Sequence, residues 1–315
     1  MHYGLDEKQL EAQYKNHLSN FKSWNQQEHA HDWVLFPENI GSQISIDETS
    51  LSQGELYTIV TNKSGKGRKG SLIAMVKGTD VETVCAVLMR LSRRIRWKVR
   101  EVTLDMASNM EKIIHRCFPP ARQVTDRFHV QKLAYEAVQE MRIKHRWNAI
   151  DNESNALALA KAKGESFRQV IFENGDTCKQ LLARSRYLLF KKESLWGPSQ
   201  RTRAAILFRE YPDIKKAYYL SQQLGLIYHQ CYQKEVALTR LARWYDQVDN
   251  SGFLSFGTVA RSIQTHYANI INYFENRATN ASAESFNAKI KAFRTALRGV
   301  RDIKFFIFRI CNIFA

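Results

Sequence analysis

Apolar and polar positions alternate along five short segments in the first half of the chain, which is the pattern of β-strands. These segments are rich in Val, Ile, Leu and Thr, and turn-forming residues separate them. The expected strands are Gln43–Asp47, Leu56–Thr61, Ser71–Val76, Glu101–Asp105 and Arg122–Asp126. Short turns between the first three predict antiparallel pairing, and helical connections before the last two predict parallel additions to the same sheet.

Other segments repeat apolar residues at steps of three and four, which predicts helices. Thr79 and Asp80 can cap a helix that runs to about Leu91, a second helix is expected at 107–117, and a third begins after residue 126. Strand patterns nearly disappear after residue 150. The helices expected in the rest of the chain are 153–163, 176–191, 200–209, 213–221, 233–247, 256–276, 281–297 and 302–313.

This order of elements predicts an α/β fold whose mixed five-stranded sheet is interrupted by an all-α insertion. We expect residues 1–42 to be an N-terminal lead-in and residues 43–150 to form the first part of the sheet domain. Residues 151–278 would form the helical insertion, and residues 279–315 would supply the helices that complete the sheet domain.

Composition indicates a folded protein that binds polyanions. The 315 residues are 44% hydrophobic, and Lys+Arg of 47 against Asp+Glu of 31 give a net charge of +16. Nucleic acid is the first expected partner, and an anionic membrane surface is the alternative. No run of roughly 18 apolar residues predicts a membrane span, and the polar N-terminus does not resemble a signal peptide. Five scattered cysteines without a C-x-x-C pair indicate reduced thiols, so we expect a cytoplasmic protein.

Three acids suggest a metal site. Asp47 and Asp105 end expected strands and are followed by small polar residues, and Glu284 lies on the expected helix 281–297. Phosphoryl transfer depends on metal ions and positioning, and Mg²⁺ binds a few carboxylates. Asn280, Glu284 and Asn287 share one face of that helix. Alternatively, Glu284 could form only surface ion pairs with Lys289 or Lys291.

Asp126 and His129 form a second constellation, at the end of the fifth expected strand. Asp126 could add a carboxylate to the site or cap the following helix, and His129 could be a buried helix residue or a supporting donor. The glycine- and lysine-rich segment 62–70 is either a hairpin tip or a phosphate contact. Trp196 lies at an expected helix break and is more typical of a core residue than of a surface for base stacking.

The segments around these acidic residues together resemble one protein family. Four segments carry the resemblance, which extends from about residue 43 to the C-terminus: Ile46–Ser50, Leu104–Ala107, Phe118–Lys132 and Asn280–Lys291. In these segments the sequence is similar to bacterial insertion-sequence DDE transposases of the ISL-three type. The D-R-F-H and A-E-x-x-N-x-x-I-K blocks are specific when they occur together.

This resemblance implies a ribonuclease-H-like core in which Asp47, Asp105 and Glu284 bind Mg²⁺ (or Mn²⁺) and catalyse the reaction. Asp126, His129 and Asn287 would support them. The implied reaction is hydrolysis at transposon ends, followed by attack of the freed 3′-hydroxyl on target DNA. The same fold could also serve a nuclease that does not join strands, and a non-catalytic DNA-binding protein derived from a transposase is a further alternative.

The resemblance implies that the partner is DNA, both at the transposon ends and at the target. It also implies a homodimer or larger synaptic complex and a nucleoid-associated location. The residues expected to contact DNA are Lys66, Arg68, Lys69, Arg93, Arg94, Arg127, Trp196, Lys289, Lys291, Arg294 and Arg298. Such transposases usually carry an N-terminal zinc-binding and helix-turn-helix region, which has no counterpart ahead of residue 43. That region is either missing or encoded as a separate polypeptide, so recognition of the transposon ends by this chain alone stays open.

Overall fold

The computed structural model describes residues 6–52, 54–297 and 299–315, and these form two compact units. The sheet unit comprises the chain up to Asp126 together with Arg277–Ala315, and the helical unit is Arg127–Asn276. The predicted division at residue 150 lies inside a long helix of the second unit. Among the described residues, no helix has both the length and the apolar character that crossing a bilayer requires.

The sheet unit is built on one mixed sheet of six strands in the order β1-β4-β3-β2-β5-β6. Its strands are β1 (Trp33–Leu35), β2 (Gln43–Ser52), β3 (Glu55–Asn62), β4 (Leu72–Lys77), β5 (Glu101–Leu104) and β6 (Arg122–Thr125). The pairs β1–β4, β4–β3 and β3–β2 are antiparallel, whereas β2–β5 and β5–β6 are parallel. All five predicted strands and their mixed pairing are confirmed. The prediction of five strands was wrong by one, because β1 adds an edge strand.

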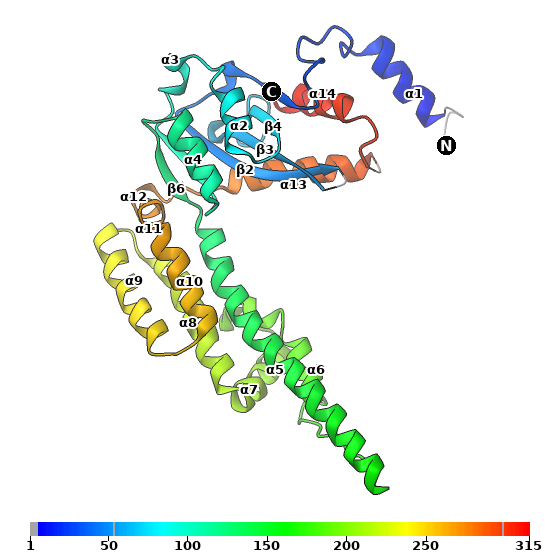
Figure 1. The fold of residues 1–315 in the computed structure, drawn as a ribbon, viewed down its shortest axis with the longest axis vertical. Helices are drawn as coiled ribbons and strands as arrows, with labels where there is room; N and C mark the ends of the chain where they lie inside the picture. The colour runs from blue at the N-terminus through cyan, green and yellow to red at the C-terminus, as the bar shows by residue number, and fades with distance from the viewer. Residues whose placement is uncertain (1–5, 53, 298) are drawn as a thin grey trace. The chain divides into compact units, whose positions relative to one another are not determined.

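Two layers of helices cover the sheet (Figure 1). On one face, α2 (Val81–Leu88) and α4 (Ser108–Cys117) pack against alternate residues of β2 and β5, among them Ile46 and Leu104. On the other face, α13 (Ala281–Ala296) and α14 (Ile303–Phe314) bury Phe286 and other apolar residues against β2, β3 and β4. Asp80 caps α2 as predicted, since its carboxylate accepts the Thr83 N–H at 2.9 Å.

The N-terminal segment belongs to the sheet unit. It contains α1 (Glu7–Gln13), a π-helical turn at Tyr14–Leu18 and β1, and a 3₁₀ turn at Pro37–Asn39 follows. Phe21 packs edge-on against Phe305 of α14 at 5.2 Å between ring centroids, and the Tyr57 hydroxyl donates to the His31 carbonyl at 2.9 Å. The segment is therefore integral to the fold.

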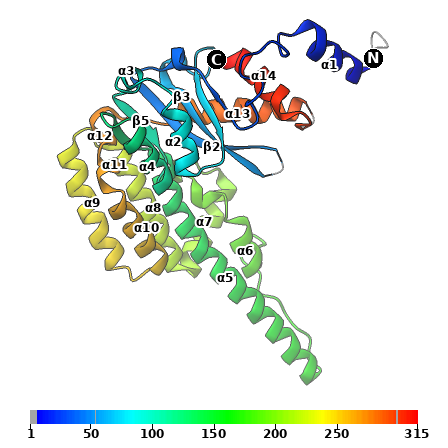
Figure 2. The same cartoon turned by 45° about the horizontal axis from the view of Figure 1, so that its top comes forward.

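The helical unit is an antiparallel assembly around one long helix. Its helices are α5 (Arg127–Lys163), α6 (Cys178–Arg184), α7 (Pro198–Glu210), α8 (Pro212–Gln230), α9 (Lys234–Asp249), α10 (Leu254–Thr265), α11 (Tyr267–Ile271) and α12 (Tyr273–Asn276), with 3₁₀ turns at Leu188–Phe190 and Glu193–Leu195. Helices α6, α8 and α10 pack against α5, and the end of its C-terminal half extends beyond them (Figure 2). Exposed apolar side chains on that half include Trp147 and Leu157.

Two buried polar side chains of the helical unit, those of Asp176 and Trp196, have close hydrogen-bond partners. The Asp176 carboxylate is fully buried and accepts from Arg203 Nε at 2.7 Å and from Arg184. Burial alone would raise the pKa of Asp176, but the hydrogen bonds from the two guanidinium groups outweigh it and lower that pKa. Trp196 is buried, and its indole N–H donates to the Leu188 carbonyl at 2.9 Å. Its ring is therefore part of the core, and the structure does not expose it for base stacking.

Candidate active site

Three aspartates lie at one edge of the parallel part of the sheet. The last paired residues of β2 and β5 are Ser45 and Thr103, and Thr103 in turn pairs with Val124 of β6. Two residues further along each strand stand Asp47, Asp105 and Asp126. Because side chains alternate along a strand, equal offsets from these pairs direct the three carboxylates to the same face. We call Asp47, Asp105 and Asp126 the acid row.

The same face carries helix α13, which brings a fourth acid and an amide to the acid row. The Asn287 amide donates to Asp47 Oδ2 at 2.8 Å. Glu284, one turn earlier on the same helix face, has a carboxylate oxygen within 4.8 Å of one of Asp126. Glu284 thus lies beside Asp126, which the sequence had marked as supporting, and the catalytic roles of these acids stay predictions.

Backbone contacts fix the orientation of two carboxylates in the row. Asp47 Oδ1 accepts the N–H of Glu48 at 2.8 Å, and Asp105 Oδ1 accepts the N–H of Ala107 at 2.8 Å. Desolvation, and then the nearby charge of Asp105, raise the pKa of Glu48 above its ordinary value. Glu48 was not singled out from the sequence, although it directly follows Asp47.

Two of the cations that were predicted to contact DNA, Lys289 and Arg294, instead help to hold α13 on the sheet. Lys289 Nζ donates to the Gly67 carbonyl at 2.6 Å, and Arg294 donates to the Leu51 carbonyl at 3.2 Å. Lys291 is exposed. Lys289 thereby joins the glycine-rich turn between β3 and β4 to the helix that carries Glu284, so this turn is a hairpin tip anchored beside the candidate site.

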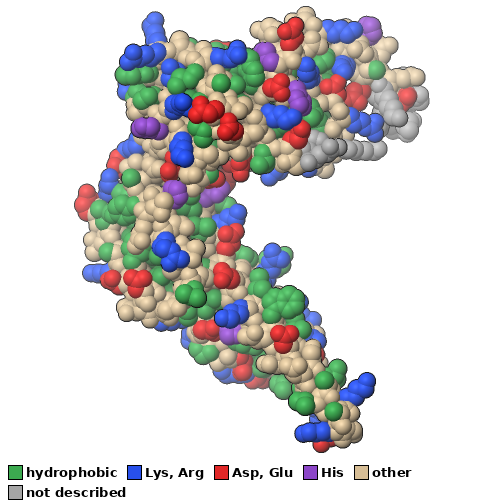
Figure 3. All heavy atoms as spheres, viewed as in Figure 1, with side chains coloured by type: hydrophobic (Ala, Val, Ile, Leu, Met, Phe, Trp, Pro, Cys, Tyr) green, Lys and Arg blue, Asp and Glu red, His purple; other side chains and the backbone are tan. Residues whose placement is uncertain are grey.

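The remaining predicted DNA contacts are mostly exposed. Those with exposed side chains are Lys66, Arg68, Lys69, Arg93, Arg94 and Arg127. Arg93 lies over the ring of Trp97 at 4.5 Å, in the short helix α3 (Arg93–Arg96). Arg298 lies outside the described residues. On the face shown in Figure 3, Lys and Arg side chains are interspersed with acids instead of forming one continuous patch. His129 lies in the first turn of α5, in the helical unit.

A layer of buried polar residues lies next to the acid row on the same face. Lys63 Nζ donates to Thr103 Oγ1 at 2.8 Å and lies 3.5 Å from Glu101 Oε1. Burial lowers the pKa of Lys63, while the neighbouring Glu101 opposes that change. Sequence reasoning missed this lysine, which it grouped with the flexible segment 62–70. Its position directly after a strand that pairs with β2 was the available signal.

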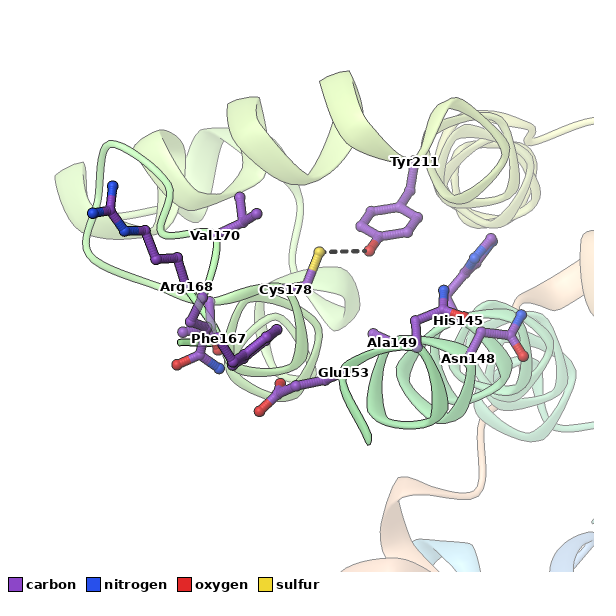
Figure 4. Close-up of a pocket in the computed structure, with 12 residues that line it drawn as sticks. His145, Asn148, Ala149, Glu153, Phe167, Arg168, Val170, Cys178 and Tyr211 are labelled. Atoms are coloured by element: carbon purple, nitrogen blue, oxygen red, sulfur yellow. Dashed lines mark hydrogen bonds between the residues drawn. The ribbon is translucent and has the colours of Figure 1, made fainter. Parts of the chain in front are cut away.

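The helical unit contains a cavity of about 420 Å³, whose lining residues differ from those of the candidate site. Figure 4 shows Cys178 and Tyr211 facing each other there, with 3.5 Å between sulfur and hydroxyl oxygen. Glu153 is the one carboxylate among its described lining residues, and Lys179 binds it at 2.6 Å. This cavity therefore lacks the grouped acids that a hard-metal site needs.

The donor set of the acid row fits a hard divalent cation. Mg²⁺ and Mn²⁺ favour oxygen ligands, and carboxylates of Asp47, Asp105, Asp126 and Glu284 gather at this edge. The oxygens of Asp126 and Glu284 lie within 4.8 Å of each other, so a small side-chain adjustment would let one cation bind both, since each Mg²⁺–oxygen bond is about 2 Å. Two like charges at such separation also repel each other unless a cation or proton lies nearby.

Comparison with known proteins identifies the family. Residues 44–310 match the model of a transposase family, the DDE transposases of the ISL-three type. The transposase for insertion sequence element IS1001 from Bordetella parapertussis is 23% identical over 271 residues, which cover 85% of this chain and 59% of that relative. This chain thus spans about three-fifths of the relative's length. No solved structure matches significantly. The chain therefore belongs to the DDE transposases of the ISL-three type.

Proposed function

We propose that this chain is the catalytic part of a transposase that cleaves DNA at transposon ends and joins the freed 3′-hydroxyl to target DNA. The observation that carries the proposal is the placement of four acids on one face of the sheet, at the end of its parallel strands. The parallel strands β2 and β5 carry Asp47 and Asp105, and Asp126 follows β6. Helix α13 carries Glu284, which lies beside Asp126, and Asn287, which donates a hydrogen bond to Asp47.

In this proposal Asp47, Asp105 and Glu284 hold Mg²⁺, and Mn²⁺ can replace it. Bound divalent cations would stabilise the attacking and leaving oxygens of an in-line displacement at phosphorus. Asn287 keeps the Asp47 carboxylate turned toward α13 through its 2.8 Å hydrogen bond, and the Asp105 carboxylate is fixed by the Ala107 N–H. Asp126 is a further ligand or the partner that orients Glu284, and His129 supports this group.

Water and then the 3′-hydroxyl would act as successive nucleophiles at this one site. Hydrolysis breaks a phosphodiester at the transposon end and leaves a free 3′-hydroxyl. That hydroxyl then attacks a target phosphodiester, so one bond forms as another breaks. The mixed sheet, with antiparallel strands followed by two parallel ones, supports the ribonuclease-H-like core that family membership implies. Exposed cations such as Arg68 and Arg93 would contact phosphates without reading sequence.

Cleavage and strand transfer of labelled DNA test the proposal. The purified chain, with any separately encoded recognition polypeptide, is incubated with DNA that bears the terminal repeats and with Mg²⁺. We expect nicked ends and joined products, both lost in Asp105→Ala. Cleavage without joining would replace the proposal with a nuclease. If wild type and Asp105→Ala leave the DNA equally intact, the catalytic assignment is wrong.

A further inference from the structure

The second half of helix α5 carries a row of apolar side chains that are open to solvent. Ile143 is 43% exposed, Trp147 57% and Leu157 55%, and Ile150 between them is partly exposed. Together with the exposed Ser154, these residues follow one another at steps of four and three. This is the spacing of the contact face in helices that pair along their length. We call these five residues the α5 stripe.

The α5 stripe lies on the side of α5 that faces away from the rest of the helical unit. On the opposite side, His145 and Asn152 line the cavity of about 420 Å³, and the buried Arg142 donates to the Leu182 carbonyl at 2.9 Å. At about 100° per residue, all three lie across the helix from Ser154. A row of exposed apolar side chains on one helix face marks an interaction surface.

Charged residues flank the α5 stripe with opposite signs toward its two ends. On one flank the exposed Lys144 is followed seven residues later by the exposed Asp151. On the other flank Arg146 is followed seven residues later by Glu153, which also binds Lys179 at 2.6 Å. Residues seven apart are separated by about 10 Å along a helix, which is too far for a direct ion pair. Each flank is therefore complementary to its own reversed copy.

An antiparallel second copy of α5 brings these charges together. In the register that places Trp147 of one copy opposite Ile150 of the other, Lys144 lies beside Asp151 of the second copy. Two-fold symmetry repeats this pair. Leu157 then lies opposite the part of α5 where α10 begins, and Leu254 at that point is 89% exposed. Apolar and charged positions thus fit the same register.

We propose that the α5 stripe pairs antiparallel with the α5 stripe of a second copy of this chain, so that the helical unit joins two copies. The apolar side chains supply affinity, and the flanking charges set direction and register. This surface goes beyond the proposed function, because it uses no residue of the acid row and needs neither metal nor DNA.

Sedimentation equilibrium of the full chain, without DNA or added metal, tests the pairing. We expect a monomer–dimer equilibrium whose dissociation constant rises at least about thirtyfold in Trp147→Ser, because a central aromatic contact is lost from both copies. Leu159→Ser is the matched control and should change nothing. Leu159 is 62% exposed on the same helix, but it lies two residues from Leu157 and hence on nearly the opposite side.

A charge exchange tests the register. Lys144→Glu and Asp151→Lys should each raise the dissociation constant about fivefold, because like charges then face each other at two places. The double variant should return close to the wild-type value. Both side chains are exposed, so the fold should survive, and circular dichroism checks this. A chain that stays monomeric at every concentration, an unchanged dimer in Trp147→Ser, or a double variant without rescue would each overturn the proposal.

Discussion

Two buried aspartates, one in each unit of this protein, have different neighbours. In the helical unit, Asp176 lies between the guanidinium groups of Arg184 and Arg203. In the sheet unit, Asp126 lies beside another carboxylate, that of Glu284. Removing one member of a buried ion pair destabilises a fold, whereas acids placed beside each other repel when both are charged. We propose that Asp126 and Glu284 serve the candidate metal site, and that the Asp176 cluster stabilises the helical unit.

The largest expected effect is on catalysis by the acid row. Asp105→Asn should lower DNA cleavage and strand transfer by about a thousandfold or more, equivalent to about 4 kcal/mol of transition-state stabilisation. The metal-free variant should be at least as stable as wild type, because one of several like charges is gone. Product formation on labelled DNA and urea unfolding measure the two quantities. A large loss of stability would instead make Asp105 a structural acid.

The matched change in the helical unit should give the reverse pattern. Asp176→Asn leaves the largely buried Arg203 and the exposed Arg184 without their charge partner and should lower the free energy of unfolding by about 3 kcal/mol. Since the pKa of Asp176 is depressed, its contribution is fully present above about pH 4 and is lost as the pH falls through the lower folded value. Faster amide hydrogen exchange in α6 and α7 would locate the loss. Unchanged exchange there would contradict the structural role.

Much of the sheet unit could be predicted from sequence, because its strands carry local alternation and Asp105 directly follows β5. Asp47, which was expected at a strand end, lies within β2, because that strand continues to Ser52. Asp47 and Asp105 were expected to be neighbours, and the parallel pairing of β2 with β5 confirms the strand arrangement behind that expectation. Strand β1 was missed because three residues that include Trp33 give too short a pattern. The closeness of Asp126 to Glu284 was not visible either, since it depends on how α13 crosses the sheet.

In the helical unit, local sequence patterns did not predict where the helices continue and where they break. Helix α5 runs unbroken through residues 142–152, where the apolar spacing fades, because Ala, Leu and Lys further along keep helix propensity high. The predicted helix 256–276 is broken into three, and His266 has a non-helical backbone at the first break. Lys63 and Glu101 likewise lie far apart in sequence, so their ion pair had no local signal.

A smaller effect is expected for the exposed cations of α3. Arg93→Ala combined with Arg94→Ala should weaken DNA binding modestly and reduce the slope of log affinity against log salt by about 2, one for each lost phosphate contact. Filter binding across a salt series checks this. The matched change of Arg184 to Lys in the helical unit keeps its charge and should leave the slope unaltered. An unchanged slope in the α3 variant would remove these arginines from the DNA interface.

The smallest effect concerns Glu48 beside the acid row. Its raised pKa means that the charged form of Glu48 is disfavoured in the folded protein. The charged carboxylate therefore lowers the stability of the fold as the pH rises through the pKa of Glu48, and this loss is absent at lower pH. Glu48→Gln should stabilise the metal-free protein at pH 7 by no more than about 0.5 kcal/mol, because solvent screens this exposed group. Thermal unfolding at pH 4 and pH 7 tests it. Equal gains at both pH values would point to packing instead of charge.

The most direct test of the acid row is the position of a bound ion. Anomalous diffraction from crystals soaked in Mn²⁺ would locate the metal independently of any activity. We expect a peak about 2 Å from carboxylate oxygens of Asp47 and Asp105, with Glu284 or Asp126 completing the set. The peak should be lost in Asp105→Asn, because that variant lacks one of the expected metal ligands. A protein that cuts DNA in Mn²⁺ but binds the ion away from these acids would contradict the account.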